Sequence, residues 1–141
     1  MSIFEKLFRR RPRQATPVEQ VSTILGRFTT ATLMGVDRED IGRYPAKQHK
    51  VMAFHFGAIE YLGEQLGLDE IQILGVFVMF LDKYFNMPVA ETGSISERLQ
   101  GFRDHPDERR YLEAGREVCR RWHEQNDRRA PLELGELLKG S

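Results

Sequence analysis

The chain has 141 residues, which suits one domain, and its content of 40% hydrophobic and 30% charged residues is globular rather than disordered. Its 21 basic and 21 acidic residues give a formal net charge of zero, which argues against a surface built throughout for polyanions. Cys119 is the single cysteine, so an internal disulfide is excluded and an oxidising compartment is not implied.

Residues 1–15 are predicted to form a basic amphipathic arm. Residues 1–14 hold five lysines and arginines against one glutamate, a net charge of +4, which leaves −4 for the rest of the chain. An apolar face beside a basic flank is typical of weak attachment to an anionic membrane surface. Contact with a partner protein, docking on the protein's own body and a plain tail are the alternatives. The residues expected to make the contact are Ile3, Phe4, Leu7, Phe8, Arg9, Arg10 and Arg11.

Residues 16–139 are predicted to form a single compact all-α domain of five to six helices. Thr16 is a hydroxyl N-cap, Pro17 suits the first helical position and Glu19 completes a capping box, so a helix should begin here. The apolar spacing continues to Gly35, where we expect this helix to end. The connection that follows is expected to hold at most a single helical turn after Asp37.

A second long helix is predicted over residues 46–66, followed by a tight joint. Gly67 can end the helix in left-handed geometry, Leu68 can pack back on the last turn, and Asp69 can cap the next helix. The joint therefore predicts an antiparallel hairpin with a helix over residues 70–85.

The helix at about 70–85 is apolar on nearly all sides, so we expect it to be the central helix of the bundle. Its β-branched and aromatic residues leave a strand as the alternative. The apolar run at 71–81 ends at Asp82 and Lys83, well short of the roughly 20 residues that cross a bilayer. We therefore expect a soluble, cytoplasmic protein, with the arm as its means of peripheral attachment at the inner face of the membrane.

The C-terminal third is predicted to be helical as well. Ser94 and Glu97 form a capping box for a short helix that ends near Phe102. A long amphipathic helix then runs from Pro106 past Trp122, and one or two final turns end near residue 138. On the long helix, seven arginines between 109 and 129 alternate with six acidic residues between 107 and 127. This pattern is typical of a solvated, salt-bridged face, so nucleic-acid binding is not expected.

Motifs for metals and phosphates do not occur in the sequence. It contains no cysteine pair, no H-E-x-x-H, no Walker loop and no G-x-G-x-x-G, so we predict neither a metal nor a cofactor. Four glycines that lie singly inside helices, Gly57, Gly63, Gly75 and Gly115, are interpreted as sites of close helix packing, with a ligand pocket as the alternative. Cys119 is expected to be a small buried apolar residue.

His55 is the strongest candidate for chemistry, together with Asp82. His55 shares the apolar face of its helix, and the predicted hairpin brings Asp82 level with Phe54, within one turn of the histidine. A buried histidine with a carboxylate can be catalytic, but it is more commonly a satisfied polar pair in a core. Both residues are therefore weak catalytic candidates.

We expect a small soluble all-helical protein of bacterial type whose function is non-enzymatic: an adaptor or regulatory protein that binds another protein, or a second copy of itself, through helix faces. The alternative is a ligand-binding protein or enzyme with a pocket around His55, Asp82 and Tyr84. The first hypothesis predicts a continuous exposed apolar patch. The second requires His55 to be reachable from solvent.

Overall fold

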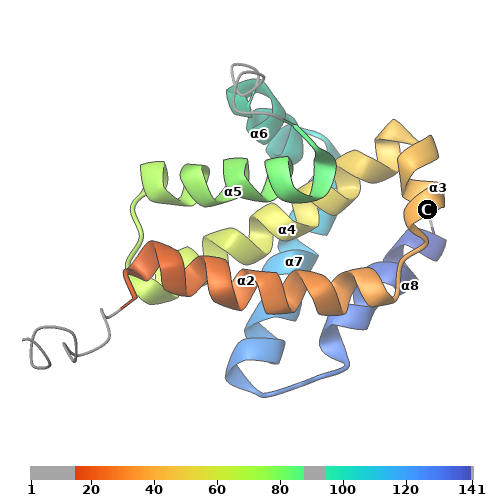
Figure 1. The fold of residues 1–141 in the computed structure, drawn as a ribbon. Helices are drawn as coiled ribbons and strands as arrows, with labels where there is room; N and C mark the ends of the chain where they lie inside the picture. The colour runs from red at the N-terminus through yellow and green to blue at the C-terminus, as the bar shows by residue number, and fades with distance from the viewer. Residues whose placement is uncertain (1–14, 88–94, 141) are drawn as a thin grey trace, which may run out of the picture.

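The computed structural model describes residues 15–87 and 95–140. Within these ranges the chain forms seven α-helices, one short 3-10 helix and no strand, which confirms the predicted all-α bundle (Figure 1). The arm residues named above lie outside the described ranges, as does Ser94. The elements are α2 (Pro17–Met34), α3 (Arg38–Arg43), α4 (Pro45–Leu66), α5 (Glu70–Phe85), α6 (Ile95–Asp104), α7 (Pro106–Glu124), η2 (Ala130–Leu132) and α8 (Glu133–Lys139).

The first helix begins as its sequence predicts. The Thr16 hydroxyl accepts a hydrogen bond from the backbone N–H of Glu19 at 3.2 Å, and Pro17 occupies the first turn. The turn expected after Asp37 is a six-residue helix, α3, capped by the Asp37 carboxylate.

The joint between α4 and α5 has the predicted geometry. Gly67 is left-handed, with φ of 75°, and the N–H of Leu68 donates to the carbonyl of Gly63 at 2.8 Å. Asp69 and Gln72 cap each other's backbone N–H groups at the start of α5. The two helices therefore form the predicted antiparallel hairpin.

The central helix is α4 rather than α5, which corrects the prediction for residues 70–85. In α4 twelve residues are buried, whereas in α5 only Val76, Phe77, Phe80 and Leu81 are. Figure 1 shows α4 passing between α5 and α2, with α7 behind it. The reason is that six other helices of the described chain pack on α4, whereas α5 packs mainly on α4 and α2 and reaches α6 through the rings of Phe77 and Phe102.

Glycines explain how closely α7 approaches α4. A Cβ atom on Gly57 would lie 2.0 Å from the carbonyl oxygen of Leu112, and one on Gly115 would lie 1.8 Å from that of Phe54. Each helix therefore presents a glycine to the other's backbone. The close-packing interpretation is confirmed at Gly57 and Gly115.

The last elements close the bundle around α2 and α7. The hydroxyl of Tyr111 on α7 donates to the carbonyl of Leu137 on α8 at 2.9 Å. A Cβ on Gly135 would lie 2.1 Å from the carbonyl oxygen of Gly35, so α8 touches the end of α2 directly. On the outer side of α7, Arg116 pairs with Glu64 at 2.7 Å, one of several ion pairs that form the predicted salt-bridged face.

Across the described ranges, none of the helices has both the length and the hydrophobicity that crossing a bilayer requires.

Candidate functional site

His55 is sealed in the core, with both ring nitrogens paired. Its relative exposure is 0%; Nδ1 lies 2.8 Å from the carbonyl oxygen of Val51, and Nε2 lies 2.8 Å from the hydroxyl of Thr32 on α2. Burial lowers the pKa of His55 to about 4, so the ring is neutral near pH 7. Because a carbonyl can only accept, the proton is on Nδ1, and Thr32 donates its hydroxyl proton to Nε2.

Aromatic rings surround this histidine. The centroid of Phe80 lies 4.8 Å from that of His55 with the rings stacked, and Phe54 and Phe28 meet it edge-on at 5.5 and 6.1 Å. Both ring nitrogens form their hydrogen bonds within the protein, without water. His55 therefore links α4 to α2 through a buried hydrogen bond to Thr32.

Asp82 and Tyr84 do not join His55. Asp82 is exposed on α5, and it is not among the groups hydrogen-bonded to His55. Asp82 and Tyr84 line one groove of about 320 Å³ between α2 and α5, but His55 does not line it. The pocket expected around these three residues is therefore not formed, and the core interpretation of His55 holds with Thr32 as its partner.

Two further candidate chemistries find no site among the described residues. Cys119 is fully buried, and burial raises the pKa of its thiol to about 12, so the reactive thiolate is suppressed. In residues 15–87 and 95–140, no group of three histidine, cysteine, aspartate or glutamate side chains is placed to hold a metal ion.

One side of α5 carries a stripe of exposed apolar side chains, and Met79 at its edge also lines the groove between α2 and α5. Ile71 is 80% exposed and Met79 is 58% exposed, and between them Gly75 is exposed with no atom within 4 Å of where a Cβ would stand. These three residues are four apart and so share one side of the helix. We call this stripe, Ile71, Gly75 and Met79 with the partly buried Leu74 and Val78, the outer face of α5.

Gly75 departs from the close-packing interpretation that holds for Gly57, Gly63 and Gly115. Gly57 and Gly115 meet backbone, and Gly63 meets the side chain of Ile73, whereas Gly75 meets nothing in the described chain. A helical glycine costs about 1 kcal/mol relative to alanine. Close contacts recover this cost at Gly57, Gly63 and Gly115, but not at Gly75, nor at Gly26 on α2, which also has open space around it.

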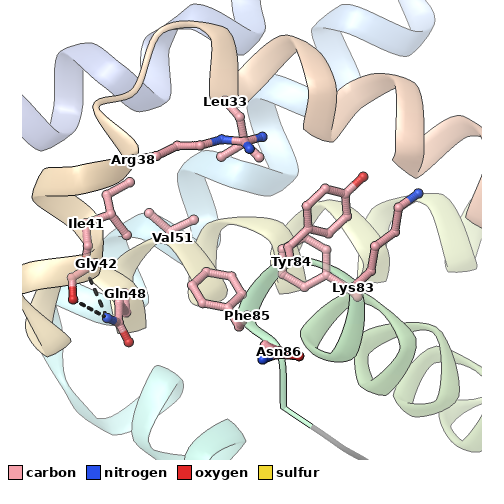
Figure 2. A pocket seen from close by; sticks show the side chains of 11 residues that line it. Leu33, Arg38, Ile41, Gly42, Gln48, Val51, Lys83, Tyr84, Phe85 and Asn86 are labelled. Carbon is pink, nitrogen blue, oxygen red and sulfur yellow. Dashed lines mark hydrogen bonds between the residues drawn. The ribbon is translucent and has the colours of Figure 1, made fainter.

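A pocket of about 380 Å³ lies between the ends of α2 and α5 and the start of α3 and α4 (Figure 2). We call it the α3–α5 pocket. Its floor is apolar, and its rim carries Arg38, Lys83, Tyr84 and Asn86. Figure 2 shows Arg38 reaching from α3 toward Leu33, above Val51 and the ring of Phe85. The apolar lining residues are Leu33, Ile41, Val51, Phe80 and Phe85.

The charge on this pocket has one sign. Arg38 and Lys83 are both in its lining, and no aspartate or glutamate is. The amide of Gln48 is already engaged, because it donates to the carbonyls of Ile41 and Gly42 at 3.2 Å each, shown dashed in Figure 2. The Lys83 nitrogen lies 5.4 Å from the centroid of the Tyr84 ring.

Sequence reasoning expected an exposed apolar patch but did not place it on one side of α5, and it missed the α3–α5 pocket. The pattern of residues 70–85 did indicate the outer face, because a helix that is apolar on nearly all sides is expected to be buried on nearly all sides. For the α3–α5 pocket no signal of this kind existed, since its lining comes from four helices and the residue that ends α5.

No protein-family model matches the chain, and comparison with curated proteins and with solved structures gives no match either.

Proposed function

We propose that the protein is a non-catalytic binding protein that pairs with a second copy of itself through the outer face of α5. The observation that carries this proposal is the mismatch between the composition of α5 and its burial. The helix is apolar on nearly all sides, yet Ile71 and Met79 are left 80% and 58% exposed. An exposed apolar stripe of this kind marks an interaction surface.

The arrangement of the stripe suits a copy of itself. A two-fold interface brings the same patch together from both chains, so the patch must complement itself. In an antiparallel pair centred on Gly75, Ile71 lies level with the partner's Met79, and the two glycines allow the helix axes to approach closely. The two Asp82 carboxylates then lie about 20 Å apart along the helices, so they do not repel each other strongly.

Two other occupants fit the face less well. An anionic membrane would meet the exposed acids Asp69, Glu70 and Asp82 at the two ends of α5, where the electrostatics are unfavourable. An enzyme's substrate would need a reactive group, and His55 is enclosed with both nitrogens paired.

The expected association is weak. Full burial of an apolar side chain contributes about 1.5–3 kcal/mol, so the exposed parts of four such side chains contribute roughly 4–8 kcal/mol in a pair. Association itself costs at least about 4 kcal/mol, which leaves at most about 4 kcal/mol from these side chains. This corresponds to a dissociation constant of about 1 mM or weaker, so detection of the dimer needs protein concentrations near 1 mM.

Sedimentation velocity of the full-length protein over a concentration series tests this proposal. We expect the wild-type mass to rise above 16.4 kDa with concentration and Met79→Lys to stay at 16.4 kDa. Met34→Lys is the matched control, because Met34 is 79% exposed but lies at the end of α2, outside this face. A wild-type protein that stays monomeric throughout, or a Met79→Lys variant that associates as the wild type does, contradicts the proposal.

We also propose that the basic arm, residues 1–14, makes weak contact with an anionic membrane surface and so holds a cytoplasmic protein at the inner face. Its net charge of +4, against −4 on the remainder, supports this. Co-sedimentation with vesicles, with and without anionic lipid, should show binding by the full-length protein and a loss of binding when residues 2–13 are deleted. Equal, negligible binding by both proteins contradicts this proposal.

A further inference from the structure

We propose that the α3–α5 pocket binds a small amphipathic carboxylate, an acid with an apolar body and a single carboxyl group. The argument rests on the charge of the rim, the apolar floor and polar groups that have no partner in the described chain. It is independent of the outer face of α5.

The rim of the pocket supplies positive charge without compensation. Arg38 has no hydrogen bond or ion pair with any described residue, and neither it nor Lys83 has a carboxylate beside it in the lining. In contrast, Arg116, Arg120 and Arg121 are all paired with glutamates. A guanidinium donates two parallel hydrogen bonds to a carboxylate, so Arg38 is the group that recognises the charged end.

Two neutral polar groups also line the pocket. The hydroxyl of Tyr84 and the side-chain amide of Asn86 line the same pocket and make no hydrogen bond to another described residue. Asn86 is held in place by its backbone, which ends α5 in left-handed geometry with φ of 54°. The Tyr84 hydroxyl can complete the hydrogen bonds of a carboxylate held by Arg38, whereas Asn86 lies on the other side of the pocket, beyond the ring of Phe85 (Figure 2).

The floor selects for an apolar body. Ile41, Val51 and Phe80 are at most 8% exposed, and Leu33 and Phe85 complete a surface that offers no hydrogen bonds from its side chains. The volume of about 380 Å³ falls within the range of small-molecule sites. A ligand of roughly eight to ten carbons can lie on this floor while its carboxylate reaches Arg38.

A phosphate or nucleotide fits less well than a monocarboxylate. The pocket lies at the C-terminal end of α5, where the backbone carbonyls carry partial negative charge and disfavour a dianion about twice as strongly as a monoanion. Arg38 is the single guanidinium in the lining, and the Lys83 ammonium lies over the Tyr84 ring. One guanidinium and one apolar floor match a singly charged amphiphile.

Titration of full-length, isotope-labelled protein with octanoate, followed by backbone and side-chain amide NMR shifts, tests this inference. We expect saturable shifts at Gly42 and Asn86 with a dissociation constant of about 1 mM, and binding of octanamide at least roughly tenfold weaker because it lacks the charge. Octanoate that binds no better than octanamide, or that shifts residues away from this pocket instead, overturns the inference.

Substitutions at Arg38 and at two control positions test whether Arg38 binds the carboxylate. Arg38→Gln should weaken octanoate binding roughly ten- to hundredfold with no change in the thermal unfolding midpoint, since Arg38 is exposed and unpaired among the described residues. Arg43→Gln, on the same short helix but outside the pocket, should bind as the wild type does. Met79→Lys should also bind normally, which separates this inference from the proposed dimer. An Arg38→Gln variant with unchanged affinity refutes the assignment.

Discussion

Lowering the pH from neutral to about 4 should destabilise the fold through His55. The pKa of this histidine is lowered by burial to about 4 in the folded state, from an ordinary value of 6.5. Below pH 6.5 the unfolded chain therefore takes up a proton that the folded chain does not. The free energy of unfolding must fall as the pH falls through this window, and it is fully restored above pH 6.5.

The size of the effect follows from the difference between the two pKa values. Each unit of difference corresponds to 1.36 kcal/mol, so a difference of about 2.5 units corresponds to about 3 kcal/mol. Because the side chain is fully buried, solvent screening does not reduce this figure.

Urea unfolding of the wild type and of His55→Leu, each at pH 7 and at about pH 4, isolates this contribution. Carboxylates titrate equally in both proteins, so their effects cancel in the comparison. In the variant the hydroxyl of Thr32, which no longer donates to His55, can turn to donate to the carbonyl of Thr29, 2.8 Å away, so it keeps a hydrogen-bond partner. The wild type should lose about 3 kcal/mol more than the variant. Equal losses of unfolding free energy in the two proteins would refute the description of this site. So would a His55 ring that titrates near pH 6.5 in the folded protein.

Two further predictions concern packing. Gly57→Ala should destabilise the fold by about 2 kcal/mol or more in urea unfolding, because the added Cβ would lie 2.0 Å from the backbone of α7. Gly26→Ala should instead stabilise the fold by up to about 1 kcal/mol, because a Cβ at Gly26 has open space around it. If both substitutions have the same sign, the α4–α7 contact is not as close as described. Cys119 should resist thiol reagents in the native protein at pH 8 and react fully in urea, since it is buried with its pKa raised to about 12. Rapid labelling of the native protein would show that this thiol is reachable.

The parts of the fold that depend on neighbouring residues could be predicted from the sequence. The cap at Thr16 and the joint at Gly67 and Asp69 are local structures, and their residues leave few alternatives. The place of α5 in the bundle could not be predicted in this way. An apolar pattern indicates that a helix face is buried, but it does not indicate whether that face packs against the same chain or against another molecule.

The candidate sites were harder still, because they depend on contacts between distant helices. The residue numbering of the predicted hairpin placed Asp82 near the level of His55 along the two helices. In the structure α2 packs on that face of α4 and supplies Thr32 as the partner of His55 instead. Arg38 and Tyr84 line one pocket because α3 and the end of α5 lie on different sides of it, and no periodicity in either segment encodes that arrangement.

The proposed pairing of two chains through α5 is tested most directly by a cross-link at its centre. In an antiparallel pair the two-fold axis passes close to Gly75, so Gly75→Cys should form a disulfide-linked dimer, of twice 16.4 kDa, under mild oxidation. The native Cys119 is buried and does not compete. Met34→Cys, equally exposed on α2, should remain largely monomeric. If Gly75→Cys links no faster than Met34→Cys, the chains do not pair through this face.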